Sequence, residues 1–520
     1  VPSTHAGPLP DGHLCGPAMA TTAVSPSRCR SHGCFLRLVA TAAAVLAAFG
    51  LARAAGSSAD DHVLLNVGSL LPGPRCATPQ EHEPSGATSA RMRIVHQHGP
   101  CSPLADAHGK PPSHAEILAA DQNRVESIQR RVSATTSKLK KRAAPVQPAP
   151  KKNRPGIHPG HSASSSSPSL PATSGRELGT GNYVVTVGLG TPASKYTVVF
   201  DTGSDTTWVQ CRPCVARCYK QKEPLFDPAK SSTYANVSCA DSACDELDES
   251  GCTSGNCLYA VQYGDGSYTV GFFAQDTLTV NHDAIKGFRF GCGEKNRGLF
   301  GKTAGLLGLG RGKTSLTVQA QYRYGGAFAY CLPASPSGTT GYLDFGPGAS
   351  PANARVTPML TDNGPTFYYV GLTGIRVGGQ QVPVPESVFS KTGTLVDSGT
   401  VITRLPATAY AALSTAFTAG MAAQGFKKAP AYSILDTCYD FTGVSEATLP
   451  AVSLLFKGGA CLDVDPSGIL YAITEAQVCL AFASNGDDDS IGILGNTQQK
   501  TYGVVYDLGK KTVGFAPDAC

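Results

Sequence analysis

Histidine is nearly missing from the last two thirds of this 520-residue chain. Eleven of its 12 histidines lie at or before His161, and only His282 follows. A catalytic serine needs a histidine base, and the Gly-x-Ser-x-Gly elbow that presents such a serine is missing too. Zinc sites usually need histidines or a second matched cysteine pair, which Cys211 and Cys214 lack. We therefore expect neither serine–histidine catalysis nor a metal site.

Long hydrophobic runs are also missing. The apolar run Leu38–Ala52 has 15 residues, fewer than the roughly 20 that cross a membrane. Arginines precede it, and its last residue Ala52 together with Ala54 offers small residues for cleavage, as in a signal peptide starting at Met19. The stretch Gly12–Ala59 has no acidic residue, which also suits a plastid transit peptide. We expect a secreted, extracellular or vacuolar protein without a membrane anchor, with the plastid as the alternative.

Cysteine, by contrast, is abundant. Thirteen of the 18 cysteines follow residue 200, and seven of these lie between Cys211 and Cys257. This density favours disulfide bonds formed in an oxidising compartment over a zinc site. The sequence Asn236-Val-Ser238 is a glycosylation sequon, which is consistent with secretion.

The charges divide the chain into two parts. The residues before Pro171 hold 18 of the 43 Lys and Arg but only 9 of the 38 Asp and Glu, so they carry +9 and the remainder −4. We hypothesise that the basic part shields the acidic body near neutral pH and is released as carboxylates become protonated. The alternative is a solvated basic tail without a partner.

The basic part has two kinds of sequence. Residues His114–Arg142 show apolar positions near helical spacing, which predicts an amphipathic helix. The Pro/Ser-rich stretch that follows cannot bury enough surface to fold, so we interpret it as an exposed linker. The body then begins near Gly179–Pro192 with a strand, a turn and a strand. The whole chain has 58 Gly and 37 Pro. Short Val/Thr/Tyr/Phe runs lie between them, and this pattern favours a mostly β architecture.

The body repeats one pair of signals. Asp201-Thr-Gly-Ser204 follows an apolar strand, and "AGLLGLG" (Ala304–Gly310) comes about a hundred residues later. Asp397-Ser-Gly-Thr400 also follows an apolar strand, with "IGILGNT" (Ile491–Thr497) at a similar separation. Two signals in the same order predict two halves with the same fold.

Two matched carboxylates can hydrolyse an amide without a cofactor. Gly203 and Gly399 allow a tight turn, and the hydroxyls of Ser204 and Thr400 can orient the neighbouring carboxylate. If a pseudo-two-fold axis relates the halves, Asp201 and Asp397 face each other and share one proton. One carboxylate then takes a proton from water while the other polarises the substrate carbonyl.

With these motifs the chain resembles the pepsin-type aspartic endopeptidases, in the plant nepenthesin-like branch that includes plastid nucleoid DNA-binding protease relatives. The resemblance covers Gly179–Cys520. It implies a mostly β, bilobal fold with pseudo-two-fold duplicated lobes, preceded by a helical and disordered prosegment. Asp201 and Asp397 match the catalytic pair. The stretch "QYGDGSYTVG" matches a substrate-covering flap with Tyr263, Gly264 and Asp265, and Trp208 matches the partner of the flap tyrosine.

The resemblance also implies domains and disulfides. The domains are a leader (1–55), a basic propeptide with its linker (56–170), an N-terminal catalytic lobe with the Cys-rich insert and flap (171–350) and a C-terminal catalytic lobe (351–520). Cys438–Cys479 is the single pairing implied by analogy, and the connectivity of the insert stays open. Cys461 is left over, so whether it is a free thiol also stays open. The disulfide candidates are Cys211, Cys214, Cys218, Cys239, Cys244, Cys252, Cys257, Cys292, Cys331, Cys438, Cys479 and Cys520.

We expect an endopeptidase active at acid pH, made as a zymogen and monomeric. Its partners are protein or peptide substrates and its own propeptide as an intramolecular inhibitor, and it needs no cofactor. One alternative is a catalytically silent inhibitor or binding protein of the xylanase-inhibitor type, although such members usually lose part of the dyad or the flap. The other is a plastid protease that binds DNA through Lys138–Pro155. Because that basic stretch lacks interleaved aromatics, we expect no nucleic-acid partner.

Overall fold

The computed structural model describes residues 61–71, 76, 90–104, 112–143, 183–263, 266–298, 300–335, 341–361 and 363–520. The predicted leader and the Pro/Ser-rich linker lie outside the described residues. Two compact units divide the chain. We call them the N-unit (Asp106–Gln319 with Thr361–Phe367) and the C-unit (Ala320–Leu360 and Tyr368–Cys520, with the residues up to Ala105). The predicted lobe boundary at residue 350 stays a prediction.

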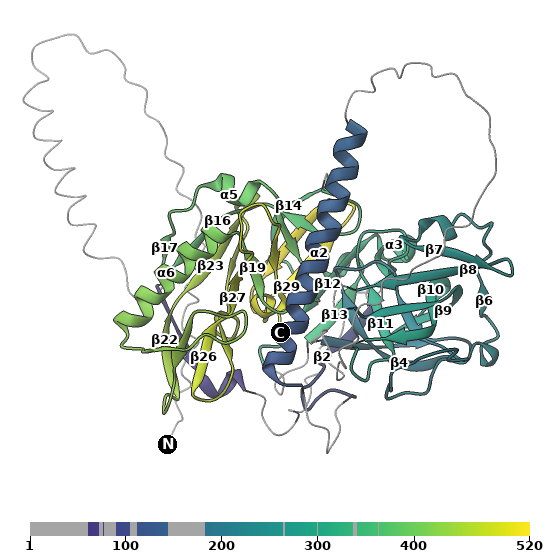
Figure 1. The fold of residues 1–520 in the computed structure, drawn as a ribbon, viewed down its shortest axis with the longest axis horizontal. Coiled ribbons are helices and arrows are strands. Elements are labelled where there is room, and N and C mark those ends of the chain that lie inside the picture. The colour runs from purple at the N-terminus through teal and green to yellow at the C-terminus, as the bar shows by residue number, and fades with distance from the viewer. Residues whose placement is uncertain are drawn as a thin grey trace, which may run out of the picture. The chain divides into compact units, whose positions relative to one another are not determined.

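The N-unit consists mainly of strands around a central one (Figure 1). Strand β4 pairs antiparallel with β3 and parallel with β11, so it has neighbours on both sides. Residues Tyr196–Asp201 of β4 are buried throughout, which explains their unbroken apolar sequence. The elements are α2 His114–Ala143, β3 Tyr183–Leu189, β4 Ser194–Asp201, β5 Trp208–Gln210, β6 Ala235–Asn236, β7 Ser250–Thr253, β8 Asn256–Gln262, β9 Tyr268–Val280, β10 Asp283–Arg297, β11 Gly305–Gly308 and α3 Leu316–Gln319.

The C-unit holds several sheets. One runs β2-β13-β12-β29-β30-β14, and a second joins β14 through β15 to β18, β28, β19 and β27. Two others are β17-β16-β23-β24 and β20-β21-β26-β25. The elements are β1 His62–Asn66, β2 Ala90–His96, α4 Gln321–Tyr324, β12 Ala327–Cys331, β13 Gly341–Phe345, β14 Arg355–Leu360, β15 Tyr369–Val370, β16 Leu372–Val377, β17 Gln380–Gln381, α5 Glu386–Ser390, β18 Thr394–Val396, β19 Thr403–Leu405, α6 Ala407–Ala423, β20 Lys428–Ala429, β21 Cys438–Asp440, β22 Glu446–Pro450, β23 Val452–Phe456, β24 Cys461–Asp463, α7 Pro466–Ile469, β25 Leu470–Ala472, β26 Gln477–Leu480, β27 Phe482–Ser484, β28 Gly492–Leu494, β29 Gly503–Asp507 and β30 Thr512–Ala516.

The predicted amphipathic helix is confirmed as α2, and its start is well capped. The amide of Ser113 donates to Glu116 Oε2 at 2.8 Å, while the amide of Glu116 donates to Ser113 Oγ at 3.3 Å. This reciprocal pair is a capping box. Leu118, Val125 and Ile128 are buried, so the apolar face seen in the sequence is the face that packs.

Two strands before α2 were not predicted, and both join the C-unit. Strand β1 pairs antiparallel with β22, and β2 pairs antiparallel with β13. Arg91 on β2 binds Asp344 on β13 with Nε at 2.8 Å from Oδ1 and Nη2 at 2.5 Å from Oδ2. The predicted propeptide therefore supplies strands to one unit and a helix to the other.

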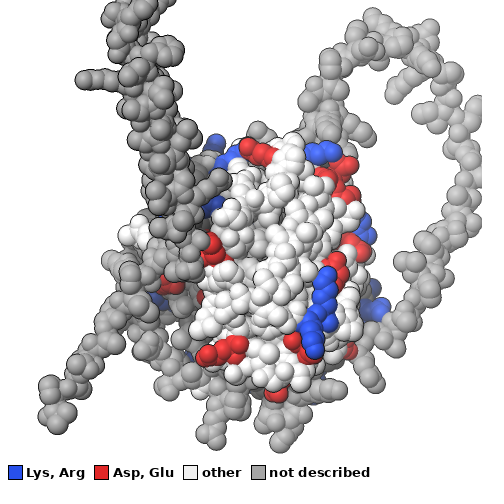
Figure 2. Space-filling model, turned by 90° about the vertical axis from the view of Figure 1, so that its left-hand side faces the viewer, with Lys and Arg blue, Asp and Glu red and all other residues white. Residues whose placement is uncertain are grey.

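Helix α6 shows how the C-unit covers its sheets. One side of the helix is buried at intervals of three or four residues, and its 17 residues include no charged side chain. Figure 2 shows a side of the molecule where uncharged atoms fill the centre and charged atoms lie around the edge. Apolar packing, rather than surface ion pairs, therefore holds α6. No helix among the described residues is long and apolar enough to span a membrane.

Each disulfide between two described cysteines joins residues of the same unit. Cys438 pairs with Cys479 across β21 and β26, the pairing that the resemblance implies. Cys461 is also disulfide-bonded, which answers the question that the sequence left open at this position. The remaining pairs in the described residues are Cys76–Cys101, Cys211–Cys292, Cys214–Cys218, Cys239–Cys252, Cys244–Cys257 and Cys331–Cys520.

The lengths of the closed loops predict unequal contributions to stability. Cys211–Cys292 spans 81 residues and Cys214–Cys218 only 4. Loop-closure entropy then predicts that Cys211→Ala/Cys292→Ala lowers the free energy of unfolding by about 4 kcal/mol, and Cys214→Ala/Cys218→Ala by about 2 kcal/mol. Denaturant unfolding followed by the fluorescence of Trp208, the single tryptophan, measures both. Equal losses would contradict this ranking.

Candidate active site

The first candidate catalytic carboxylate lies at the end of β4. Asp201 is only 1% exposed, so its charge needs partners in place of water. The Gly203 amide donates to Asp201 Oδ1 at 2.9 Å, and the Ser204 hydroxyl donates to Oδ2 at 2.7 Å. The glycine and the hydroxyl residue thus hold one oxygen each.

The second candidate carboxylate has the same surroundings in the C-unit. Asp397 follows β18 and is also 1% exposed. The Gly399 amide donates to its Oδ1 at 3.0 Å, and the Thr400 hydroxyl donates to its Oδ2 at 2.5 Å. Both loops therefore orient their carboxylate in the same way.

A parallel strand supports each loop. The Leu309 amide after β11 donates to the Asp201 carbonyl at 2.8 Å, and the Asp397 amide donates to the Leu494 carbonyl of β28 at 3.1 Å. A side chain at Gly308 would come within 2.2 Å of a backbone oxygen, so this strand approaches the loop too closely for any other residue. The Leu-Leu-Gly and Ile-Leu-Gly signals are thus the neighbours of the Asp loops. That Asp201 and Asp397 face each other stays a prediction.

Tyr263 of the predicted flap directly follows β8, which pairs with β9 in a hairpin. The Tyr263 amide donates to the Ser267 carbonyl at 2.8 Å, and Trp208 Nε1 donates to the Tyr263 hydroxyl at 2.8 Å. The Phe300 ring packs edge-on against both aromatic rings. Burial raises the pKa of Tyr263, so its hydroxyl stays neutral. Gly264 and Asp265 lie outside the described residues.

A partner of Asp201 that the sequence did not reveal comes from α2. Arg124 Nη2 lies 2.6 Å from Asp201 Oδ1. Burial raises the pKa of Asp201, but the charge and hydrogen bonds of Arg124, with those from Ser204 and Gly203, outweigh burial and hold the pKa below its usual value. Arg131, seven residues further along the helix, reaches the Gly203 carbonyl at 3.5 Å and stacks over Phe367. The seven-residue spacing between Arg124 and Arg131 was the only sequence feature that pointed to these contacts.

Asp205 is a second residue that the sequence analysis missed. Its Oδ1 accepts the Gly312 amide at 2.8 Å, which ties the Asp201 loop to the chain after β11. Burial raises the pKa of Asp205 to about 6, although hydrogen bonds from Gly312 and Thr366 and the charge of Arg131 lower it. Asp205 therefore titrates in a range that matters for an acid enzyme, and it positions the loop rather than touching the predicted reaction centre.

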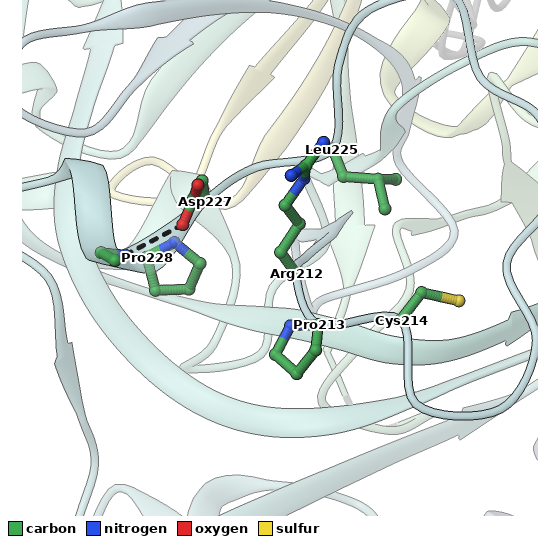
Figure 3. A pocket seen from close by; sticks show the side chains of 7 residues that line it. Arg212, Pro213, Cys214, Leu225, Asp227 and Pro228 are labelled. Carbon is green, nitrogen blue, oxygen red and sulfur yellow. Dashed lines mark hydrogen bonds between the residues drawn. The ribbon is translucent and has the colours of Figure 1, made fainter.

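Other possible sites within the described residues were compared with these loops. Among the residues that the structure describes, no group of three or more His, Cys, Asp or Glu could hold a metal ion. One open pocket of about 670 Å³ lies on the Cys-rich insert, beside Arg212, Leu225 and Asp227 (Figure 3). Asp227 accepts the Ala229 amide there at 3.3 Å, so it caps a turn. The residues lining this pocket include none of the candidate catalytic residues.

Known proteins share both the sequence and the fold. A family model described as "Xylanase inhibitor N-terminal" matches residues 183–347, and one described as "Xylanase inhibitor C-terminal" matches residues 367–517. An aspartyl protease family protein of Arabidopsis thaliana is 45% identical over 89% of this chain and 93% of its own length. Aspartic proteinase nepenthesin-2 of Nepenthes gracilis is 36% identical over 66% of this chain and 78% of its own.

Solved structures add the architecture. The crystal structure of basic 7S globulin from soybean matches with a TM-score of 0.52 at 21% identity, over 65% of this chain and 91% of that one. The structure of edgp matches with a TM-score of 0.53, also at 21% identity, over 64% and 91%. This likeness bears on the fold alone, and it confirms the mostly β, pepsin-like class. Together with the relatives' sequences, it shows that the chain belongs to the plant pepsin-type aspartic proteases, in their nepenthesin-like branch.

Proposed function

We propose that this protein is an aspartic endopeptidase that hydrolyses peptide bonds at acid pH with Asp201 and Asp397, and that it is made as a zymogen inhibited by residues 56–170. One observation carries the proposal. Two carboxylates, each 1% exposed, lie in loops with matching glycine amide and hydroxyl donors, in a chain 45% identical to an aspartyl protease family protein.

The chemistry follows from a shared proton. Two adjacent carboxyls cannot both ionise cheaply, so one keeps its proton. The ionised carboxylate takes a proton from water as the water oxygen attacks the peptide carbonyl carbon, and the protonated carboxyl gives its proton to the carbonyl oxygen. The tetrahedral diol collapses when the C–N bond breaks and the leaving amine takes up a proton. The donors from Gly203, Ser204, Gly399 and Thr400 leave each carboxylate one face for this work.

Arg124 explains how the zymogen stays inactive. Its guanidinium forms an ion pair with the Asp201 carboxylate. The positive charge neutralises this carboxylate, which would otherwise share a proton with Asp397. Because the pKa of Asp201 is lowered from 3.8 by this contact, the ion pair contributes fully above that value. Its contribution is lost as pH falls below 3.8 and Asp201 becomes protonated.

The silent-inhibitor alternative has less support. The family models carry inhibitor descriptions, but this chain retains both Asp loops, and Tyr263 retains its contact with Trp208. DNA binding through Lys138–Pro155 gains no supporting observation. Seven disulfides within the described residues support secretion or a vacuolar location, with an amino-terminal signal peptide. Asn236 lies exposed on β6, as a glycosylated residue must. We further propose that the mature protein is monomeric.

Loss of either carboxylate should abolish hydrolysis. We expect Asp201→Asn and Asp397→Asn each to lower cleavage of denatured globin at pH 4 by at least about a thousandfold, because neither variant can share a proton. Pepstatin should block the unchanged protein. Asp489→Asn, in an exposed loop, is the matched control and should keep full activity. An Asp201→Asn protein that still cleaves globin would contradict the proposed function.

Removing the inhibitory cation should loosen the zymogen. We expect Arg124→Gln to raise the pKa of Asp201 and to speed prosegment release at pH 5 by about tenfold or more, since a partly buried ion pair is broken. Release is followed by intact mass. Arg130→Gln changes an exposed arginine on the same helix and should behave as the unchanged chain does. Identical rates for the two variants would show that Arg124 does not inhibit.

The flap contact should contribute modestly to catalysis. Tyr263→Phe removes the hydroxyl that accepts the Trp208 N–H and leaves a buried donor without its partner. Loss of this hydrogen bond, at about 1–1.5 kcal/mol, predicts kcat/KM about tenfold lower and a thermal midpoint lower by a few degrees. Tyr268→Phe, in the same hairpin, is the control. Unaltered kcat/KM in Tyr263→Phe would remove Tyr263 from the flap role.

A further inference from the structure

Two histidines of the predicted prosegment lie close together at the end of β2. His96 is the last residue of β2, His98 follows two residues later, and the charge of Lys500 in the C-unit acts on His96. We propose that His96 and His98 form a pH sensor that releases strands β1 and β2 from the rest of the C-unit on acidification, before the Arg124–Asp201 ion pair breaks. This inference rests on the zymogen of the proposed function, and it identifies the groups that regulate it.

Strand pairing holds this part of the prosegment to the C-unit. Strand β2 is in register with β13 from Ala90 opposite Phe345 to Ile94 opposite Gly341. The side chains of Met92 and Ile94 are buried. Strand β1 is a second attachment, because it pairs with β22 along its full length. Neither contact involves α2 or Asp201, so this docking can be lost independently of the inhibitory arginine.

The surroundings of both histidines favour the neutral imidazole over the protonated one. The His98 amide donates to His96 Nδ1 at 3.2 Å, so a proton on Nδ1 would break this hydrogen bond. His98 Nε2 is buried without a hydrogen-bond partner among the described residues, and the two rings lie 5.9 Å apart between centroids. A second proton on either imidazole would therefore place a charge beside another ring, with poor solvation.

The charge of Lys500 makes protonation of His96 more costly. Its Nζ donates to the Ser467 carbonyl at 3.0 Å, so a hydrogen bond holds it in place. Burial lowers the pKa of Lys500 to about 8, against the opposing charge of Asp465, and the ammonium therefore persists at acid pH. Burial, with His98 and Lys500 nearby, lowers the pKa of His96 to about 3. Burial lowers the pKa of His98 to about 4.

The sign of the pH effect follows from these directions. A released prosegment binds protons on its histidines below about pH 6.5, whereas the docked one resists them down to about pH 3 or 4. Docking is therefore strongest above pH 6.5, and each histidine weakens it by up to roughly tenfold for every pH unit below. The Arg124–Asp201 pair keeps its strength until below pH 3.8. The histidines thus respond first.

Other charged groups in this interface are few. Arg91 pairs with Asp344 and lies over the Tyr342 ring, and burial raises the pKa of Asp344 despite Arg91. Arg93 is exposed and close to Cys76 Sγ. Because Asp344 also titrates on acidification, its variant Asp344→Asn belongs in the test.

The test measures prosegment release without self-cleavage. Asp397→Asn inactivates the chain and leaves Arg124–Asp201 intact, and a specific protease site inserted within residues 144–170 cuts the linker. Retention of the cut prosegment is measured by size-exclusion chromatography from pH 7 to pH 4. We expect retention at pH 7 and a release midpoint between pH 6.5 and 4. His96→Gln/His98→Gln should retain at least tenfold more prosegment relative to free fragment at pH 5 and shift the midpoint down by about one pH unit.

Controls make the outcome decisive. His282→Gln, an exposed histidine of the body, should leave the midpoint unchanged. Lys500→Met should shift it down, because loss of the ammonium makes protonation of His96 less costly, and it tests the sensor should the double variant fail to hold the prosegment at pH 7. A double variant and Lys500→Met that both release as the unchanged chain does, or a midpoint that only Asp344→Asn moves, would overturn the sensor.

The proposed function is tested separately. The chain with Asp397 unchanged is assayed for globin cleavage at pH 4. Cleavage with histidine-independent release overturns the sensor alone. Histidine-dependent release without cleavage overturns the endopeptidase and leaves the sensor standing.

Discussion

The structure depends on how two carboxylates are compensated at the ends of buried strands. Asp201 and Asp397 are each 1% exposed, and a carboxylate without partners at such a place would cost several kcal/mol. In both loops one backbone amide and one hydroxyl donate to the carboxylate, and these hydrogen bonds replace those that water would make. The parallel strand behind each loop then fixes the backbone, so the donors and the carboxylate move little relative to each other. Arg124 of α2 adds further compensation at Asp201.

Much of this could be predicted from the sequence because the signals are local. Asp-Thr-Gly-Ser and Asp-Ser-Gly-Thr put both donors within three residues of the carboxylate, and the Leu-Leu-Gly and Ile-Leu-Gly elements show where a strand must come close. The helix at His114 was predicted because its apolar residues recur at helical spacing over several consecutive turns. The mostly β class followed from short β-branched runs between glycines and prolines.

The contacts that escaped prediction join residues far apart in the chain. Arg124 and Asp201 are 77 residues apart, and no periodicity connects them. Strands β1 and β2 form by pairing with β22 and β13, which lie hundreds of residues away in the chain. Asp205 looks like an ordinary turn residue in the sequence, and only the fold places Gly312 beside it. The disulfide partners in the insert and the bonded state of Cys461 likewise depend on tertiary proximity, which cysteine spacing does not encode.

The residues before the body contact the two units in different ways. Arginines of α2 bind the Asp201 loop in the N-unit, and strands β1 and β2 pair with strands of the C-unit. In the zymogen that we propose, ion pairs therefore hold one part of the prosegment and strand pairing holds the other. The central claim remains the pairing of Asp201 with Asp397, and a crystal structure of the mature protein with pepstatin tests it most directly. Carboxyl oxygens of the two residues about 3 Å apart, both facing the inhibitor, are the predicted result. Carboxylates in separate pockets, or turned away from the inhibitor, would contradict it.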